Sequence, residues 1–204
     1  ATYEFSDGEL KREVLPSSLL NIATSIGGVD QGVRLRDIDN DGSTEIIIAN
    51  QSEQKIMRIN EQGDWIEAGP FPAPLVDPTG NDNGVRFVDL DEDGNDDVIF
   101  SNGKISGIQL FDTETGLYSR IVEDADDIPL IVRNGTNNGV WFSRQHMWVQ
   151  NENTNRLPDG VDRRSFAQLL GKAEPGPRTP ERSLGSIEVQ PGFKVELVAA
   201  EPLV

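Results

Sequence analysis

Two short acidic segments hold the residues whose types and spacing are best suited to chemistry. Both read D-x-D-x-D-G-x-x-D/E, and their acidic positions are Asp37, Asp39, Asp41 and Glu45 in the first and Asp89, Asp91, Asp93 and Asp97 in the second. Alternate side chains of a tightly curled loop converge on one centre, and the glycine at the sixth position permits the positive φ that curling requires. Carboxylates gathered in this way are suitable ligands for a hard divalent cation.

The predicted cation is Ca²⁺, with one ion in each loop. Calcium takes about six to eight oxygen ligands, which three monodentate aspartates, one backbone carbonyl and one bidentate acid nearly supply, and water completes the shell. Magnesium's rigid octahedron suits so compact a loop less well, and zinc prefers nitrogen or sulfur. The predicted ligands are Asp37, Asp39, Asp41, Ser43 and Glu45 in the first loop and Asp89, Asp91, Asp93, Asn95 and Asp97 in the second, with Ser43 and Asn95 contributing carbonyls.

Two other readings of these loops are weaker. An EF-hand would need its bidentate glutamate at the twelfth loop position, where this chain has Ile48 and Phe100. Asp-Gly segments also form plain polar hairpins, because aspartate caps turns and tolerates unusual backbone angles. Two copies that match at five positions favour the cation site over the plain hairpin.

Both loops lie inside a long internal repeat. The segment GVRLRDIDNDGSTEIIIAN, which begins at Gly32, returns as GVRFVDLDEDGNDDVIFSN from Gly84, an offset of 52 residues without a gap. Each unit is predicted to form four short strands separated by Gly, Asn and Asp turns. Four-stranded units of about 40 to 55 residues are typical of β-propeller blades, whereas a β-sandwich would not predict so constant a period.

The predicted fold is therefore all-β: a partial β-propeller of four-stranded blades with calcium loops, followed by a linker and the start of another β domain. The blades are assigned to residues 1–156, with units near 32–83 and 84–138 and an eroded unit at 139–156. In the eroded unit the acidic loop is deleted, so no third calcium is expected there. Residues 157–188 are predicted to form a short helix, at Arg163–Leu170, and a Pro- and Gly-rich linker, and residues 189–204 the first strands of the next domain.

Composition narrows the classes of partner. The chain has 204 residues, a formal net charge of −17 and a pI near 4.3, so its field repels nucleic acid and anionic membranes and attracts cations. No stretch approaches the roughly 18 apolar residues of a membrane-spanning helix, so no membrane span is predicted. The absence of cysteine excludes disulfides, thiolate metal sites and covalently attached haem within these residues.

Other residues that could do chemistry have simpler structural readings. His146, the one histidine, lacks a neighbouring acid-and-nucleophile arrangement and is read as a locally hydrogen-bonded strand residue. Trp65, Trp141 and Trp148 either pack blades together or form a platform for stacking sugars, and packing is the favoured reading. No catalytic or organic-cofactor site is predicted, and whether the chain serves an enzyme is left open.

The two loops and their GVRF…DxDxDG…DVIF frame resemble the FG-GAP or VCBS repeats of integrin-type β-propellers. A narrower resemblance concerns residues 134–166 and PGFKVELVAAEPLV (191–204), which are similar to the N-terminal part of the large PVC-type haem-binding proteins of planctomycetes. That second resemblance implies a downstream propeller like a membrane-bound sugar dehydrogenase and a CxxCH cytochrome module. Only calcium ligation transfers residue by residue to this chain.

Three hypotheses about function follow. The first is a calcium-binding, non-catalytic β-propeller scaffold or binding module of a larger exported protein, extracellular or periplasmic, whose partner is the rest of its polypeptide or another subunit. The second is the N-terminal portion of a secreted, haem-containing oxidoreductase whose catalytic part lies outside this chain. The third is an adhesion module that binds a glycan or a protein through its loops.

Overall fold

The computed structural model describes residues 2–6, 9–13, 22–122, 128–171 and 194. In this part of the chain, nearly all regular structure is β, in antiparallel sheets. The helical exceptions are the short 3₁₀-helix η2 (Thr154–Arg156) and helix α1 (Phe166–Leu169). The predicted all-β class is confirmed.

Two four-stranded sheets form the centre of the molecule. The first sheet contains β5 (Val33–Arg36), β6 (Glu45–Ala49), β7 (Gln54–Ile59) and β8 (Trp65–Pro70), and the second contains β9 (Val85–Val88), β10 (Asp97–Ser101), β11 (Ser106–Asp112) and β12 (Leu117–Ile121). Within each sheet, strands follow one another in chain order. Ile46 pairs with Met57, and Val98 with Gln109 at the same offset, so the sequence repeat is also a repeat of strand register.

The third sheet has three strands and differs from the sequence prediction. Strands β15 (Val140–Ser143), β16 (His146–Val149) and β17 (Asp162–Ser165) pair in that order. The turn between β15 and β16 consists of Arg144 and Gln145, with φ of 50° and 60°. Two consecutive residues with positive φ match a tight hairpin turn. This turn stands where the other two units carry an acidic loop.

The predicted helix at Arg163–Leu170 is only partly correct. Its first residues belong to β17 instead, because they pair with the free edge of β16, where Trp148 lies opposite Arg163. The helix starts after Ser165, whose hydroxyl accepts from the Gln168 N–H while the Gln168 side chain accepts from the Ser165 N–H. The third sheet thus continues beyond residue 156. Residues 172–188 of the predicted linker and the predicted strands at 189–204 lie outside the described residues, Lys194 excepted.

Small hairpins flank the sheets. They are β1–β2 (Thr2–Ser6 and Glu9–Glu13), β3–β4 (Ser25–Ile26 and Val29–Asp30) and β13–β14 (Val132–Arg133 and Thr136–Asn137). An isolated bridge between Val76 and Asp82 takes the corresponding place before β9. The first strand of each of the three sheets is therefore preceded by a short turn structure.

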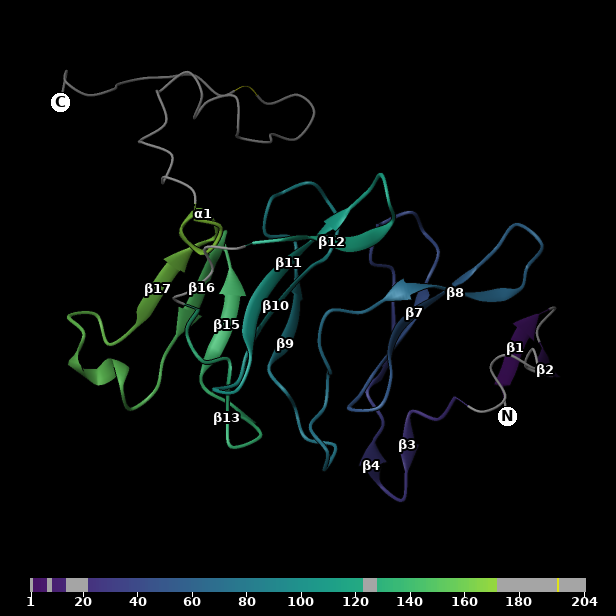
Figure 1. Cartoon of the computed structure of the whole chain (residues 1–204), viewed down its shortest axis with the longest axis horizontal. Helices are drawn as coiled ribbons and strands as arrows, with labels where there is room; N and C mark the ends of the chain where they lie inside the picture. Colours follow the sequence, from purple (N-terminus) through teal and green to yellow (C-terminus); the bar gives the residue numbers. More distant parts are fainter. Residues whose placement is uncertain (1, 7–8, 14–21, 123–127, 172–193, 195–204) are drawn as a thin grey trace.

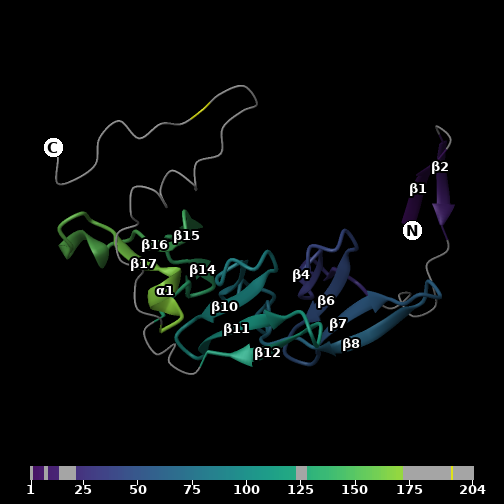
Figure 2. The same ribbon diagram turned by 90° about the horizontal axis from the view of Figure 1, so that it is seen from above.

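The sheets lie side by side in chain order, and the hydrophobic cores fill the spaces between them (Figures 1 and 2). All five residues of β6 and of β10 are buried. Because side chains alternate between the faces of a strand, both faces of these central strands must be covered. Val98 packs in the core between the first and second sheets, and Ile99 packs in the core between the second and third.

Equivalent glycines allow each sheet to begin in the same way. Gly32, Gly84 and Gly139 have φ of 70°, 83° and 77°, and a Cβ at each would lie 2.2, 2.7 and 1.9 Å from a backbone carbonyl oxygen at the end of the neighbouring strand or just beyond it. The carbonyl of each glycine also accepts a hydrogen bond, for instance from Ser101 N–H at 3.2 Å for Gly84. Only glycine fits both the dihedral angle and the close approach.

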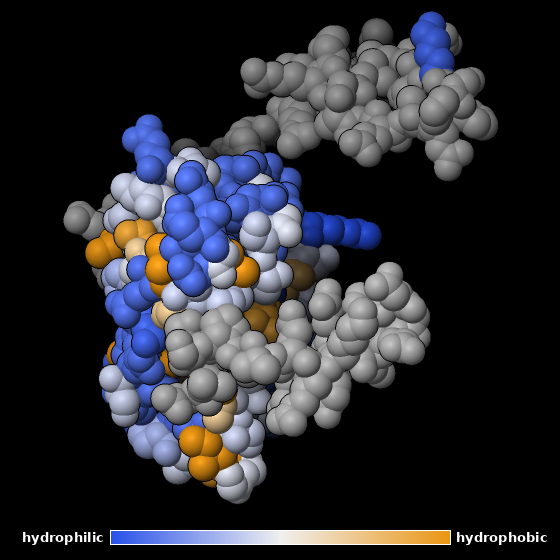
Figure 3. Space-filling model, turned by 90° about the vertical axis from the view of Figure 1, so that its right-hand side faces the viewer, coloured by the Kyte–Doolittle hydropathy of each residue, from blue (hydrophilic) through white to orange (hydrophobic). Residues whose placement is uncertain are grey.

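The side of the molecule seen in Figure 3 shows hydrophobic residues in small separate groups among hydrophilic ones. On the first sheet, Leu35 of β5 is 68% exposed, although its repeat equivalent, Phe87, packs against the core between the first two sheets. The same apolar position is therefore exposed on the first sheet and covered by a neighbouring sheet on the second.

Candidate metal centres

The two acidic loops join the first and second strands of their sheets and lie beside each other. The Asp96 N–H of the second loop donates to the Ile38 carbonyl of the first at 2.8 Å. Both Nε and Nη2 of Arg36 donate to the Asp96 carboxylate, and the Arg36 guanidinium lies 4.8 Å from the centre of the Phe87 ring. Hydrogen bonds and an ion pair thus connect the loops of neighbouring sheets.

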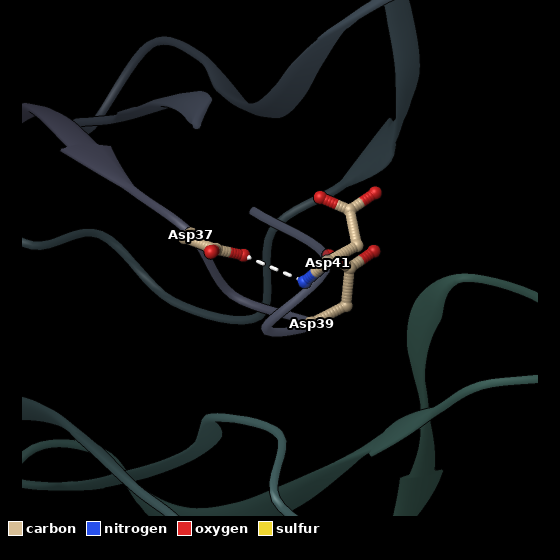
Figure 4. A group of neighbouring side chains, drawn as sticks. All are labelled: Asp37, Asp39 and Asp41. Atoms are coloured by element: carbon tan, nitrogen blue, oxygen red, sulfur yellow. Dashed lines mark hydrogen bonds between the residues drawn. The ribbon is translucent and has the colours of Figure 1, made fainter. Parts of the chain in front are cut away.

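The first aspartate of each loop holds the turn together. Asp37 accepts from the Asp41 N–H at 3.1 Å (Figure 4) and from the Gly42 N–H at 3.0 Å. Asp89 accepts in the same way from Asp93 and Gly94, both at 3.1 Å. The sixth-position glycines have φ of 88° and 93°, and the fourth positions, Asn40 and Glu92, are also positive at 53° and 64°. The predicted curling of the loop is confirmed.

In each loop the structure gathers three of the predicted ligands. Carboxylate oxygens lie within 4.8 Å of one another in the groups Asp37, Asp39, Asp41 and Asp89, Asp91, Asp97. Figure 4 shows the first group, with its side chains arranged around the turn. Asp39 Oδ1 is buried and accepts no hydrogen bond among the described residues. Such oxygens are suitable ligands for a hard divalent cation, because the cation accepts lone pairs from several carboxylates at once.

The other predicted side-chain ligands, Glu45 and Asp93, lie outside these two groups. Asp93 Oδ1 accepts from both the backbone N–H and the side-chain amide of Asn95 at 2.9 Å, and Asp93 is not in the second group. In the first loop the Ser43 N–H donates to Asp41 Oδ1 at 2.7 Å. The roles of the Ser43 and Asn95 carbonyls as ligands stay predictions.

The acids at the ninth position are buried and accept hydrogen bonds from backbone N–H groups of their own loops. Glu45 is 3% exposed and its Oε2 accepts from the Ile38 N–H at 3.0 Å. Asp97 is fully buried, and it accepts from the N–H groups of Leu90 and Phe111 at 2.8 Å and of Asp91 at 3.3 Å. Burial raises the pKa of Glu45, and it raises the pKa of Asp97 to about 6, because both carboxylates have lost water.

Arg58 is a site residue that sequence reasoning missed. This arginine projects from β7, and its Nη2 lies 3.1 Å from Asp39 Oδ2 while its Nε lies 3.6 Å from Glu45 Oε1. At the same register position in the second sheet stands Leu110. The sequence did hold a signal, because aligning the two copies shows a charge at this position in one copy and none in the other.

The lone histidine and the tryptophans have structural surroundings. His146 Nδ1 lies 2.7 Å from the Arg144 carbonyl, and Trp65 packs against the cluster on the outer face of the first sheet. Trp141 and Trp148 stack on each other with ring centres 5.9 Å apart, and the Arg163 guanidinium lies 5.7 Å from the Trp148 ring. Trp148 is therefore enclosed on two sides and offers little ring surface to a sugar.

A groove runs between the first strands of the two four-stranded sheets. It has a volume of about 540 Å³ and is lined in part by Arg34, Arg86, Leu35 and Phe87. Nη2 of Arg34 pairs with Asp30 at 2.7 Å, and Nη2 of Arg86 pairs with Asp82 at the same distance. The groove thus combines paired donors and acceptors with two apolar side chains.

Comparisons with known proteins point to the same segment. Residues 37–100 match the FG-GAP-like repeat, a range that starts at the first acidic loop and includes the second. Cartilage acidic protein 1 of Xenopus tropicalis is 30% identical over 111 residues, which cover 47% of this chain and 17% of that protein. No solved structure matches the chain.

The described helices, Thr154–Arg156 and Phe166–Leu169, are too short to cross a membrane. FG-GAP repeats are typical of extracellular proteins. The paired loops, their repeated register and the family match concern the same stretch of sequence. Over residues 37–100, this chain is therefore similar to FG-GAP-like repeats.

Proposed function

We propose that this chain is a calcium-stabilised segment of a β-propeller that serves as a non-catalytic scaffold or binding module of a larger exported protein. The observation that carries the proposal is the pair of adjoining loops, each with three carboxylates whose oxygens lie within 4.8 Å of one another. In extracellular fluids calcium is near millimolar, a concentration at which even sites of modest affinity are occupied.

The propeller part of the proposal is supported by the way the sheets pack. Central strands buried on both faces require a neighbour on either side, as in blades arranged around an axis. The exposed Leu35, set against the packed Phe87, marks the place where a preceding blade would lie. Further blades would come from the rest of the polypeptide or from another subunit.

The mechanism is linkage between ion binding and folding. Without the ion, repulsion among the carboxylates opposes the curled loop, and with it the loop holds the first two strands of its blade together. A ligand that binds only the folded state stabilises it by about 2.7 kcal/mol when present at 100 times its Kd.

Calcium is therefore expected to raise the melting temperature relative to chelator, by about 5–10 °C for a chain of this size. The measurement is thermal unfolding in EDTA, in calcium and in magnesium. Asp91→Ala should lose a large part of the calcium-dependent gain. Glu114→Ala, which removes one exposed acid from the β11–β12 turn, should keep it. Equal melting temperatures in calcium and in EDTA would refute the proposal.

As a second candidate, we propose that the groove between β5 and β9 binds a hydroxyl-rich ligand such as a glycan. Its Arg–Asp pairs offer donors and acceptors together, and Phe87 offers apolar surface for a sugar face. A glycan array should show binding that Arg34→Ala weakens and that the exposed-site control Lys104→Ala leaves unchanged. Equal binding by both variants, or none by the wild type, would reject this candidate.

The identity of the longer protein that contains this segment is a separate proposal. The chain spans 17% of the length of the relative that it matches. The resemblance of residues 134–166 to PVC-type haem-binding proteins supports an oxidoreductase parent whose catalytic part lies elsewhere. In that case the segment described here would act as its scaffold.

A further inference from the structure

We infer that the two loops bind calcium cooperatively, so that an ion in either loop strengthens binding in the other through a contact between Ile38 and Asp96. This inference rests on the proposed function, because it concerns how the same two loops fill. It goes further by assigning a coupling role to Arg36, Ile38 and Asp96, which lie outside the set of predicted ligands.

The contact joins two points of the backbone that are each next to carboxylates of a different loop. The Asp96 N–H donates to the Ile38 carbonyl at 2.8 Å. Ile38 stands between Asp37 and Asp39, which both belong to the first carboxylate group. Asp96 directly precedes Asp97, which belongs to the second group. A change in the backbone of either loop therefore reaches the other loop through a single hydrogen bond.

Ile38 is held firmly within the first loop. Its side chain is fully buried in the core between the first and second sheets. Its N–H donates to Oε2 of the buried Glu45 at 3.0 Å. The Ile38 carbonyl can therefore move away from the second loop only if core packing and the hydrogen bonds of the first loop change as well.

A side-chain contact holds Asp96 in the same place. Both Nε and Nη2 of Arg36 donate to the Asp96 carboxylate, and Arg36 directly precedes Asp37 in the chain. The Asp96 side chain is 18% exposed, so solvent screens this ion pair only in part. Paired hydrogen bonds between arginine and a carboxylate fix orientation as well as distance. Residues of the first sheet therefore position Asp96 through both its backbone and its side chain.

Asp97 carries the position of Asp96 into the second loop. The Asp97 carboxylate is fully buried and accepts from the N–H groups of Leu90 and Phe111 at 2.8 Å. Leu90 lies between the other two members of the second carboxylate group. The place at which Asp97 enters this network depends on the residue before it. The contact with the first loop thus affects how the second group converges.

The ion pair is specific to these two loops and is not a general feature of sheet packing. At the 52-residue offset, the equivalent of Arg36 in the second sheet is Val88. The third sheet has the tight turn of Arg144 and Gln145 in place of an acidic loop. Among the described sheets, an ion pair from an arginine of one sheet to the acidic loop of the next therefore connects the first and second alone.

The sign of the coupling follows from ordering. Without ions, repulsion among the carboxylates opposes the curled form of each loop. An ion in one loop stabilises its curl and, through Ile38 and Asp96, that of its neighbour, so the second ion has less ordering to bring about. Repulsion between the two ions acts in the opposite direction, but salt screens it within about 8 Å at 0.15 M and about 3 Å at 1 M. Added KCl should therefore leave the positive coupling in place.

A calcium titration with a separate readout for each loop measures the coupling. The N–H groups of Gly42 and Gly94 both donate to the first aspartate of their own loop, so their NMR signals report the two loops individually. In the wild type, both titration curves should have Hill coefficients greater than 1. Coefficients of 1 for both glycines would refute the coupling, and this measurement is decisive even if a variant fails to fold.

Weakening one loop should weaken the other. Asp41→Asn removes one charge from the first carboxylate group at an exposed residue. The calcium concentration that half-saturates Gly94 should then rise by about threefold or more relative to the wild type. Asp89→Asn in the second loop should raise the concentration that half-saturates Gly42 by a similar factor, because coupling between two binding sites is reciprocal.

Substitution of Arg36 tests the route of the coupling. Arg36→Gln removes the ion pair between the sheets, and it should reduce the effect of Asp41→Asn on Gly94 to about half or less. Arg34→Gln is the matched control, because it removes a positive charge from the same strand and both arginine side chains are 43% exposed. Arg34 pairs with Asp30 and not with a loop, so the effect should stay as large as in the wild type.

Each outcome decides one of the two claims. If neither glycine signal responds to millimolar calcium, the proposed function fails. If both respond but weakening one loop leaves the other unchanged, calcium binding stands and the coupling is refuted. An effect that Arg36→Gln and Arg34→Gln leave equally large would refute the route through Asp96. An effect that disappears in about 0.5 M KCl would refute it too, because the coupling would then be one of charge alone.

Discussion

Replacing Asp97 by alanine is expected to lower the free energy of unfolding by about 2–4 kcal/mol, even in the presence of chelator. The Asp97 carboxylate is fully buried and accepts hydrogen bonds from Leu90, Asp91 and Phe111. Alanine would leave these buried N–H groups without an acceptor, at a cost of about 1–3 kcal/mol each. Removal of a buried charge offsets part of that loss. Urea unfolding in EDTA measures the difference.

The control for this prediction is Asp93→Ala in the same loop. Asp93 is exposed and its contacts are local, to Asn95. Its replacement should therefore cost about 1 kcal/mol or less in EDTA. If the two variants are equally stable in EDTA, the buried acid does not hold the loop, and its importance would be limited to ion binding.

Phe111→Ala is expected to have the largest effect, a loss of about 3–5 kcal/mol. The Phe111 side chain is 1% exposed and lies in the core between the first and second sheets. Its ring packs edge-on against Tyr118 at 5.4 Å and lies beside the Arg58 guanidinium. A cavity at this place removes contacts from both sheets, so both should lose stability together.

Hydrogen exchange measures this coupling directly. The amides of Ile47 in β6 and Ile99 in β10 belong to different sheets, and exchange of both should accelerate in Phe111→Ala. Ile121→Ala is the matched control, because Ile121 is 67% exposed on β12 of the same sheet as Phe111. It should change stability by less than about 0.5 kcal/mol. Faster exchange confined to β10 would show that the sheets are independent.

The elements could be predicted well from the sequence because their signals are local. Strand alternation, the Gly and Asn turns and the 52-residue offset between Gly32 and Gly84 are all present in short stretches of the chain. The curled loop also follows from local chemistry, since Asp37 bonds to N–H groups four and five residues ahead. Turns of this kind depend little on distant contacts.

The prediction of secondary structure was wrong where a strand distant in the sequence determined the conformation of a segment. The start of the segment Arg163–Leu170 has helical spacing, but the free edge of β16 offered hydrogen bonds to it and a strand formed. Propensity over so short a segment is worth less than a complete set of backbone hydrogen bonds with a neighbouring strand. The helix that remains is limited to Phe166–Leu169.

The sequence by itself determined the repeat, the all-β class and the two acidic loops, because these depend on residue types at fixed spacing. Only the tertiary structure decided which carboxylates converge. The ninth-position acid Asp97 belongs to the carboxylate group of the second loop, whereas its equivalent Glu45 does not belong to that of the first. The tertiary structure also brought Arg58 from β7 to Asp39 and Glu45. Spacing along the chain cannot show which charge a neighbouring strand places beside a loop, because that depends on how the sheets pack.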